Sequence, residues 1–388
     1  MKIPYAWKKE TLNNVALIQT GLAKGKKEIA VPCKLPYLRV ANVQDGFLNL
    51  EEIKEIEVDR SQVERYSLKK GDILLTEGGD RDKLGRGTVW QGEIPLCLHQ
   101  NHIFVVRPNK SIIFNEFLAY LFSSPRGKKY FLSCAKQSTN LASINSTQLK
   151  HFPLVFPPLK EQKIIADILT AWDEAIGKTE RLIKLKEDYF RWLAVHAFLK
   201  NPKMKSWNFS ALGQLVKVKK GEQLNRSELE KEGAYPAWNG GITPSGYTDV
   251  WNTKENTITI SEGGNSCGFV NYCKQKFWCG GHCYSLINEN NQISDFYLYF
   301  YLKTQEKRIM SLRVGSGLPN IQKADIENFE IAYPNLKEQS EISHEFNIAL
   351  NELILIKQIL DLYKSQKQGL MQKLLTGNWR VNFKEDEE

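Results

Sequence analysis

The chain repeats itself over half of its length, and this internal repeat limits the possible folds more than any other sequence feature. The segment 157–162, PPLKEQ, returns 177 residues later as 334–339, PNLKEQ. In each copy it separates a segment of mixed composition from a long segment with a heptad pattern. A repeat on this scale indicates two related modules, each with one globular segment and one long helix.

The two globular segments match each other in detail. The matched features are Trp7 and Trp207, the strand-like stretches 72–79 and 256–264 that end in Glu-Gly-Gly, the histidine-led strands 102–106 and 282–286, and the aromatic helices 114–121 and 296–302. Two related globular segments on two similar helices predict a protein that binds two related targets. This arrangement favours binding over catalysis.

Both long segments carry apolar residues at spacings that alternate between four and three. This spacing places the side chains in one seam and is typical of a coiled coil, although two ordinary core helices are the alternative. Lys186 and Lys367 interrupt the two seams at similar places. The spacing predicts a mutual pairing of the two helices through a seam that includes Ile165, Leu169, Trp172, Ile176, Ile342, Phe346, Leu353 and Ile356.

Helix length gives the pairing a possible purpose. A helix of about 33 residues is ~50 Å long, and one turn of B-DNA is ~34–36 Å. An antiparallel pair would therefore separate two DNA readers by roughly one turn. This predicts a split recognition sequence with an unread spacer.

Composition supports a folded protein with a polyanionic partner. The 388 residues are 42% hydrophobic and 25% charged, which suits two domains with their own cores. The net charge of +9 favours DNA, although an inert basic surface would have the same charge. No apolar run of membrane-spanning length and no signal peptide is found, so the sequence predicts a soluble cytoplasmic protein with reduced cysteines.

Glycines and cations gather in matched segments of both halves, most densely at 78–87, GGDRDKLGRG. Glycine lets a backbone approach a ligand closely, and Arg or Lys can reach phosphates or guanine. Each segment alone could be a solvated turn, but their recurrence favours DNA contact. The candidate DNA-binding residues are Lys24, Lys26, Lys27, Arg39, Asn42, Gly78, Gly79, Asp80, Arg81, Lys83, Arg86, Gln137 and Ser138 in the first half, and Lys217, Lys219, Lys220, Asn239, Asn265, Arg313 and Asn320 in the second half.

Sequence signs of catalysis or metal binding are weak. The chain contains neither GxGxxG nor a P-loop motif, so it has no anchor for a nucleotide cofactor. Asp80, Asp82 and Lys83 could suggest a nuclease, but the second half keeps no such acids. Near His282 lies a cluster of four cysteines, Cys267, Cys273, Cys279 and Cys283. The cluster lacks a CxxC knuckle, which disfavours zinc ligation, so we expect these cysteines to be small buried hydrophobic residues and to form no metal site.

Taken in order, the duplicated motifs resemble those of the specificity (S) subunit of type I restriction–modification systems. They are the two PxLKEQ segments, the EGGDRDKLGRG segment at 77–87, QNHIFV at 100–105 and LLTGNWR at 374–380. The resemblance implies two target-recognition domains that each read half of a bipartite DNA site, separated by antiparallel helices that dock modification subunits. The second glycine segment, 263–270, lacks the Arg and Lys of the first, so a shared base-reading residue is not expected.

The resemblance also implies that this chain holds no catalytic residues and no cofactor of its own. Modification subunits would use S-adenosylmethionine to methylate adenine N6, and restriction subunits would use ATP and Mg²⁺. The specificity chain of a related, fused restriction–methylation system is the main alternative. A nuclease and a purely structural coiled-coil scaffold are further alternatives.

The predicted fold class is α+β, with two globular α/β-mixed domains joined by two long antiparallel coiled-coil helices in an internal pseudo-two-fold repeat. The predicted parts are target-recognition domain 1 at 1–155, helical spacer 1 at 156–200, target-recognition domain 2 at 201–332, helical spacer 2 at 333–376 and a tail at 377–388.

Overall fold

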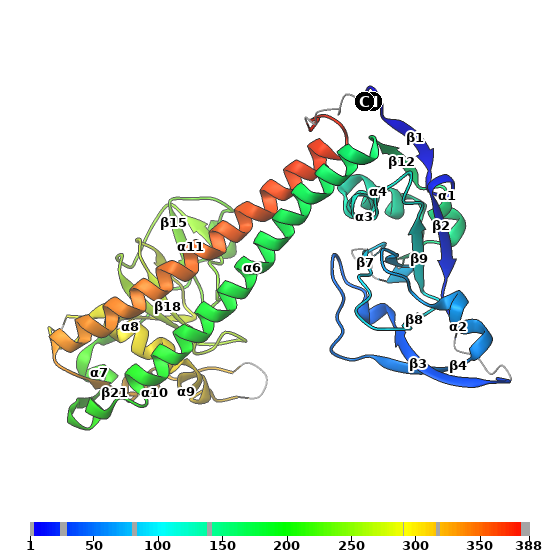
Figure 1. Cartoon of the computed structure of the whole chain (residues 1–388). Coiled ribbons are helices and arrows are strands. Elements are labelled where there is room, and N and C mark those ends of the chain that lie inside the picture. The colour runs from blue at the N-terminus through cyan, green and yellow to red at the C-terminus, as the bar shows by residue number, and fades with distance from the viewer. Residues whose placement is uncertain are drawn as a thin grey trace. The chain divides into compact units, whose positions relative to one another are not determined.

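The chain forms two units, and each unit contains one globular domain together with parts of both long helices (Figure 1). The computed structural model describes residues 4–23, 29–79, 84–137, 142–289, 291–315 and 319–381. Unit 1 comprises Met1–Lys178 and Leu360–Glu388, and unit 2 comprises Thr179–Ile359. Among the described residues, no helix has a stretch both long and apolar enough to cross a membrane.

Unit 1 contains four small sheets among its described residues; three follow here, and the fourth belongs to the candidate interface. Its four-stranded antiparallel sheet has the order β2 (Ala16–Thr20), β9 (Ile103–Pro108), β5 (Ile73–Thr76) and β7 (Gly87–Val89). A three-stranded sheet has the order β4 (Lys54–Asp59), β3 (Pro32–Leu38) and β8 (Leu98–His99), with β3 and β8 parallel, and the third sheet pairs β1 (Lys8–Thr11) with β12 (Pro153–Phe156). The helices are α1 (Leu12–Val15), α2 (Arg60–Tyr66), α3 (Asn115–Ser123), α4 (Pro125–Cys134) and α5 (Ser146–Lys150).

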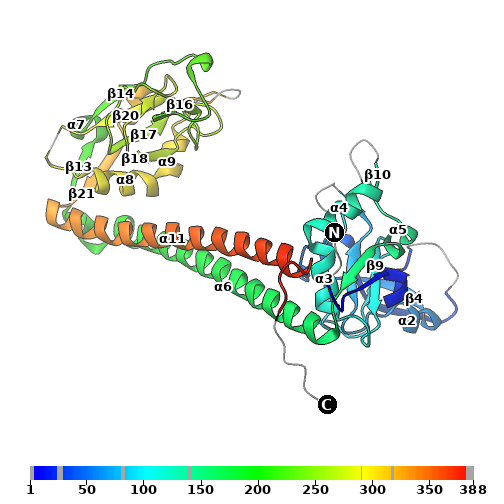
Figure 2. The same cartoon turned by 90° about the horizontal axis from the view of Figure 1, so that it is seen from above.

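Unit 2, whose strands are labelled in Figure 2, repeats the strand order of these three sheets. Its four-stranded sheet has the order β14 (Lys217–Lys220), β20 (Cys283–Ile287), β17 (Thr257–Ser261) and β18 (Val270–Cys273). The other sheets are β16 (Gly246–Thr248), β15 (Tyr235–Trp238) and β19 (Trp278–Cys279), with β15 and β19 parallel, and the pair β13 (Asn208–Ala211) and β21 (Glu330–Tyr333). The helices are α7 (Leu212–Leu215), α8 (Asp295–Thr304), α9 (Glu306–Ser311) and α10 (Lys323–Glu327).

Strand register confirms the predicted repeat. In unit 1, Thr20 of β2 lies opposite Phe104 of β9. In unit 2, the corresponding residues Lys220 of β14 and Tyr284 of β20 lie opposite each other. The predicted aromatic helices are α3 and α8, and the predicted Glu-Gly-Gly strands are β5 and β17 with their extensions. Two mixed α/β domains with one topology are therefore present.

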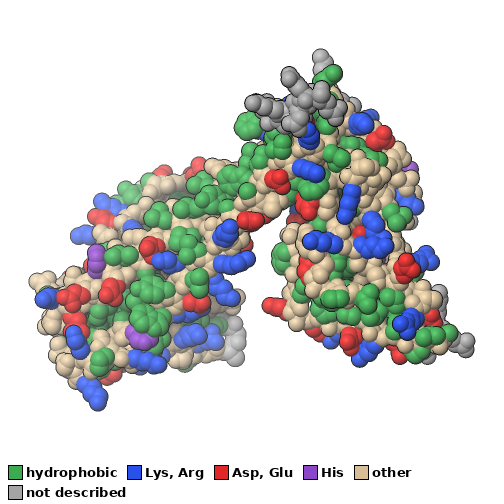
Figure 3. Space-filling model, in the orientation of Figure 1, with side chains coloured by type: hydrophobic (Ala, Val, Ile, Leu, Met, Phe, Trp, Pro, Cys, Tyr) green, Lys and Arg blue, Asp and Glu red, His purple; other side chains and the backbone are tan. Residues whose placement is uncertain are grey.

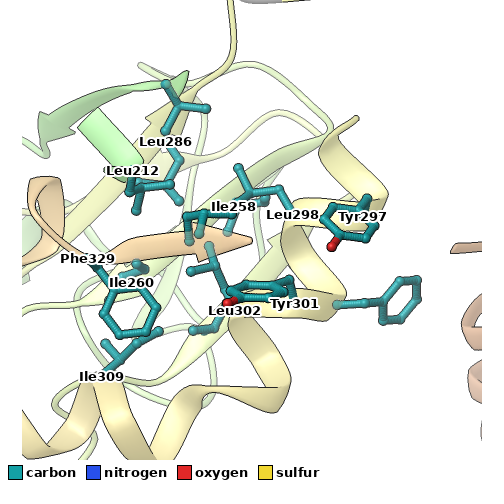
Figure 4. Packing of buried hydrophobic residues seen from close by; sticks show 14 of the residues in the cluster. Leu212, Ile258, Ile260, Leu286, Tyr297, Leu298, Tyr301, Leu302, Ile309 and Phe329 are labelled. Atoms are coloured by element: carbon teal, nitrogen blue, oxygen red, sulfur yellow. The ribbon is translucent and has the colours of Figure 1, made fainter. Parts of the chain in front are cut away.

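Each globular core extends onto the long helices α6 (Leu159–Phe198) and α11 (Leu336–Leu374). In unit 1 the core includes Ile165 and Leu169 at the start of α6 and Leu374 at the end of α11. In unit 2, Phe346 of α11 joins the core that packs around the sheet and α8, part of which is shown in Figure 4. Because each core uses both helices, the predicted boundaries at 155/156 and 332/333 do not separate independent cores.

The seam residues of α6 and α11 contact each other as the heptad pattern predicts. In unit 1, Trp172 meets Tyr363 edge to face, with ring centroids 5.5 Å apart. In unit 2, Phe190 meets Phe346 in the same way at 5.3 Å. Both seam lysines bind carboxylates across the pair, since Lys186 reaches Glu352 at 2.6 Å and Lys367 pairs with Asp173.

The repeated PxLKEQ motif attaches each long helix to its own globular domain through a buried glutamine. Gln162 accepts a hydrogen bond from the Phe114 N–H at 2.8 Å and donates to the Ile112 and Pro157 carbonyls. Gln339 makes three equivalent bonds, which join it to Ser294, Gln292 and Pro334. Both glutamines are fully buried, so their bonds hold the first helical turn against the loop before α3 or α8.

The two ends of the described chain meet in unit 1. The Arg380 guanidinium binds both oxygens of the buried Glu161 carboxylate at 2.7 and 2.8 Å and donates to the Tyr5 carbonyl. Lys373 lies 3.8 Å from the centroid of the Trp379 ring. Residues 375–380 therefore join the end of α11 to the start of the chain.

Candidate nucleic-acid interface

In unit 1, the fold brings together predicted residues that are far apart in sequence. The strand β6 (Gly78–Gly79) continues from β5 and pairs with β11 (Ala142–Ser143), which also pairs with β10 (Lys136–Gln137). Gly78, Gly79 and Gln137 thus lie in one small sheet. Several other candidates lie outside the described residues, namely Lys24, Lys26, Lys27, Asp80, Arg81, Lys83 and Ser138, as does Asp82.

Arg86 lies in a turn that is held closely against β5 and α4. It follows Gly85, whose φ of +65° and proximity to the Phe131 ring leave no room for a Cβ atom. The Arg86 carbonyl accepts the Thr76 N–H at 3.0 Å, which holds this turn against β5. Its Nε atom is buried and has no hydrogen-bond partner among the described residues. Because this Nε atom is buried, a contact with DNA would have to use the terminal nitrogens of the guanidinium.

The loop after β3 corrects one predicted contact. Asn42 is buried, and its side chain binds the Arg39 N–H and the Asn49 and Glu52 carbonyls. With both polar atoms engaged, Asn42 shapes the loop and is not available to DNA. Arg39 is partly available, since it pairs with Glu52 at 3.1 Å while its buried Nε has no partner among the described residues.

In unit 2, the corresponding glycine segment is joined to the loop after α9. Gly263 forms a β-bridge with Asn320, and the Gly264 N–H donates to the Pro319 carbonyl at 3.0 Å. The side-chain oxygen of Asn320 accepts a bond from Gln322 at 2.8 Å. The two further candidates near this bridge, Asn265 and Arg313, are exposed.

The three candidate lysines of unit 2 lie on β14, an edge strand. Lys219 pairs with Glu222 at 3.4 Å on the surface, whereas Lys220 binds the buried Glu262 at 2.6 Å. Lys217 is exposed. The candidate Asn239 accepts the His282 N–H at 3.1 Å and so packs against the loop before β20.

Sequence reasoning missed two carboxylate–histidine pairs beside these segments. Glu77 binds His102 with Oε2 2.7 Å from Nδ1, and Glu262 lies 3.8 Å from Nδ1 of His282. The signal was present, because both glutamates precede Gly-Gly and both histidines precede a matched strand. In the sequence these residues serve to align the two halves, and none of them was predicted as a site residue.

The cysteine cluster of unit 2 is apolar, as predicted. Cys273, Cys279 and Cys283 are buried and pack with Phe277 against Trp238. Burial raises the pKa of Cys273 to about 12, so this thiol stays protonated. Within the described part of the chain, no three His, Cys, Asp or Glu residues are grouped to hold a metal ion.

The seam residues of the helices predicted to dock partners are instead used inside this chain. Ile165, Leu169 and Phe346 are buried in the two domain cores. Trp172 packs on Tyr363. The remaining members of this set are partly buried, namely Ile176, Ile342, Leu353 and Ile356. A partner would have to bind another face of the helices.

Comparisons with known proteins identify the family. Residues 4–187 and 204–362 match the family described as the type I restriction modification DNA specificity domain. The chain is 28% identical over 411 residues to a protein named as the type I restriction enzyme MjaX specificity subunit of Methanocaldococcus jannaschii, covering 98% of this chain and 95% of that protein. It is 31% identical over 182 residues to a type I specificity subunit of Mycoplasma pneumoniae, covering 45% and 48% of the two chains.

The fold is also found in a solved structure. The S subunit of a type I restriction-modification system from M. genitalium superposes with a TM-score of 0.67 at 19% identity and covers 99% of each chain. That likeness extends over both repeats, and the family match covers both globular domains and most of both long helices. The chain therefore belongs to the family of type I restriction–modification DNA specificity subunits.

Proposed function

We propose that each unit reads one half of a bipartite DNA sequence for a type I complex. The observation that carries this proposal is the shared register of the two four-stranded sheets, both of which lead into a Glu-Gly-Gly segment bridged by a second loop. Sequence differences on a common frame suit two related but distinct half-sites. The net charge of +9 supports binding to a phosphate backbone.

This chain would supply specificity without chemistry. Modification subunits would methylate adenine N6 with S-adenosylmethionine, and restriction subunits would bring ATP and Mg²⁺. The nuclease alternative depends on Asp80, Asp82 and Lys83, which lie outside the described residues, so no observed geometry favours it. A fused restriction–methylation partner would place the same demands on this chain.

We infer that α6 and α11 form one antiparallel coiled coil and that its exposed side docks a modification subunit. In both helices the residue just before a seam position is often a large exposed apolar one. This exposed apolar stripe consists of Leu182, Leu185, Tyr189 and Trp192 in α6 and Ile348, Leu355 and Ile359 in α11. Figure 3 shows hydrophobic side chains on the exposed side of α11.

Geometry places the stripe on one side of the helix pair. The two-fold axis that relates antiparallel helices is normal to their plane, so residues preceding the seam lie on the same side in both helices. On the opposite side, Lys357 pairs with Glu187 at 2.7 Å. An apolar face with a charged reverse is typical of a protein-binding surface.

Adenine methylation in the source cell tests the proposed function. We expect sequencing of modified bases to show a bipartite adenine mark that disappears when this chain is deleted and returns when the chain is restored. Replacing the globular domain of unit 1 with that of a relative should change one half of the mark and keep the other. A mark that survives deletion, or a change in both halves, would contradict the proposal.

A further inference from the structure

A glutamate holds the same place in both units, at the base of the glycine segment. The Glu77 N–H donates to the His102 carbonyl at 3.0 Å, and the Glu77 carbonyl accepts the Ile144 N–H at 3.0 Å. Glu262 makes the two equivalent bonds in unit 2, at 2.9 and 2.8 Å. The backbone of this glutamate therefore joins the central strand, the histidine-led strand and the bridging loop.

The side-chain partners of the two glutamates differ. Glu77 binds His102, with Oε2 2.7 Å from Nδ1. Glu262 instead accepts bonds from the Lys220 ammonium at 2.6 Å and the Tyr284 hydroxyl at 3.0 Å. Burial and the bond to Glu262 raise the pKa of Tyr284, which therefore remains a donor. The histidine of unit 2 lies farther from its carboxylate, at 3.8 Å.

The two units have the same strand register but different residues at the matched positions, and this explains why the partners of the glutamates differ. Lys220 and Tyr284 lie opposite each other in unit 2, where unit 1 has Thr20 opposite Phe104. Glu262 is also more buried, with its side chain 6% exposed against 29% for Glu77. A more deeply buried carboxylate needs more donors, and the two exchanges in unit 2 supply them.

In both units the carboxylate holds a nitrogen-bearing side chain that remains open to solvent. The His102 side chain is 56% exposed, and that of Lys220 is 54% exposed. A carboxylate alone would repel DNA, but it can orient such a side chain beforehand and so reduce the ordering cost when DNA binds. Lys220 keeps further N–H donors beyond the one that Glu262 accepts.

This inference rests on the proposed function. We propose that Glu77 and Glu262 are positioning residues for DNA recognition, and that each aims one nitrogen-bearing side chain, His102 in unit 1 and Lys220 in unit 2, at a polar atom of its own half-site. The carboxylate is the same in both units, and the side chain that it positions differs between half-sites.

The test uses the chain assembled with its modification subunits and measures adenine methylation on DNA libraries in which one half-site is varied. The wild-type complex tests the proposed function, because it must first show a bipartite preference. Glu77→Gln should then lower kcat/KM at least about ten-fold through the half-site of unit 1 alone, and Glu262→Gln should do so through that of unit 2 alone. Glu222→Gln, which breaks the neighbouring surface pair with Lys219, is the matched control and should change neither.

Two results identify the DNA group that His102 or Lys220 contacts. Methylation that spreads to sites altered at one base pair indicates a base edge, whereas an equal loss over all sequences of that half-site indicates a phosphate; both support the positioning role. The variant Lys220→Gln keeps an N–H donor for Glu262 and leaves the Tyr284 hydroxyl in place, so it should fold and alter the unit 2 half-site only. Equal loss at both half-sites, or a lower melting temperature with unchanged methylation, would overturn the proposal.

Discussion

At the residue scale, the buried polar side chains of this chain mostly bind its own backbone. Asn42, Gln162 and Gln339 each complete a loop or a helix start, and none of them has polar atoms left for a ligand. Arg86 differs, because a donor of its guanidinium is buried without a partner among the described residues. Asn42, Gln162 and Gln339 therefore have structural roles, whereas the contact of Arg86 with DNA is a prediction.

The substitution Arg86→Ala tests whether Arg86 reads DNA. If Arg86 reads a base edge, we expect the variant to lose about 1–3 kcal/mol of discrimination at one base pair, because the bidentate contact disappears. Competition between DNA duplexes that differ at that position measures the effect. Arg60→Ala, an exposed arginine on α2, is the control and should behave as wild type. Identical discrimination in both variants would exclude Arg86 from base reading.

His99 predicts a pH dependence of stability in unit 1. Its ring is buried and binds the Ile103 carbonyl, and burial lowers its pKa from 6.5 to about 4. Below pH 6.5 the unfolded chain takes up a proton that the folded chain refuses. The free energy of unfolding should therefore fall as the pH drops from 6.5 toward 4, by up to ~1.4 kcal/mol per pH unit.

Chemical denaturation at several pH values measures this effect. His99→Gln should be less stable at neutral pH and should show a shallower loss on acidification. His196→Gln removes an exposed histidine and should keep the wild-type slope. Parallel pH profiles for His99→Gln and the wild-type chain would show that burial of His99 does not control the acid response.

At the scale of elements, the repeated motif and the heptads do different work. The motif glutamines attach each helix to its globular domain, and the seam pairs the helices with each other. The exposed apolar stripe takes part in neither set of contacts and is the proposed docking surface. One helix surface thus carries three sets of contacts, arranged by position within the heptad.

Gln162→Ala and Gln339→Ala should each destabilise one unit. Each removes three hydrogen bonds and leaves buried backbone groups without partners, which should cost about 2–3 kcal/mol in the free energy of unfolding. Denaturation followed by hydrogen exchange should place the loss in unit 1 for the first variant and in unit 2 for the second. Lys163→Ala and Glu341→Ala, one turn or less away and exposed, should have little effect.

Adjacent residues of α11 provide a matched test of docking. Leu355 belongs to the stripe, whereas Ile354 is an exposed apolar residue outside it. Leu355→Lys should raise the Kd for the modification subunit about ten-fold or more, because it places a charge in an apolar contact. Ile354→Lys should leave it near the wild-type value, as measured by titration calorimetry. A similar loss in both variants would contradict the assignment of the docking side.

At the scale of the whole molecule, duplication gives two recognition domains one connecting frame. Both α6 and α11 run without a break from residues of one unit to residues of the other. The ion pair between Arg380 and Glu161 joins the segment after α11 to the start of α6 in unit 1. In unit 2 the corresponding link, from α6 to Trp207, is covalent.

Lengthening both helices tests whether they set the spacer. One heptad added after Glu180 and one after Gln358 keeps the seam in register and adds ~10 Å, on the order of three base pairs. We expect unchanged half-sites and a spacer longer by about three base pairs in methylation sequencing. Seven residues inserted after Lys200, beyond the end of α6, should leave the spacer unchanged. An unchanged spacer in the doubly extended protein would show that the two helices do not set the distance between the half-sites.

The sequence alone determined the features that depend on local pattern. The repeat predicted two related domains, the four-three spacing predicted α6 and α11, and the cysteine spacing predicted a buried apolar cluster, because side-chain periodicity and spacing are local properties of the chain. The sequence also selected Gly78, Gly79 and Gln137, which lie in one small sheet, and their contact with DNA stays a prediction.

Only the tertiary structure decided how those residues are used. It showed that the side chain of Asn42 is hydrogen-bonded within its own loop, that several seam residues are buried in the domain cores, and that Glu262 forms an ion pair with Lys220. These outcomes depend on which strand lies opposite which, between segments as distant as β14 and β20. Long-range pairing sets burial and hydrogen-bond partners, and neither can be calculated from the composition of a single segment.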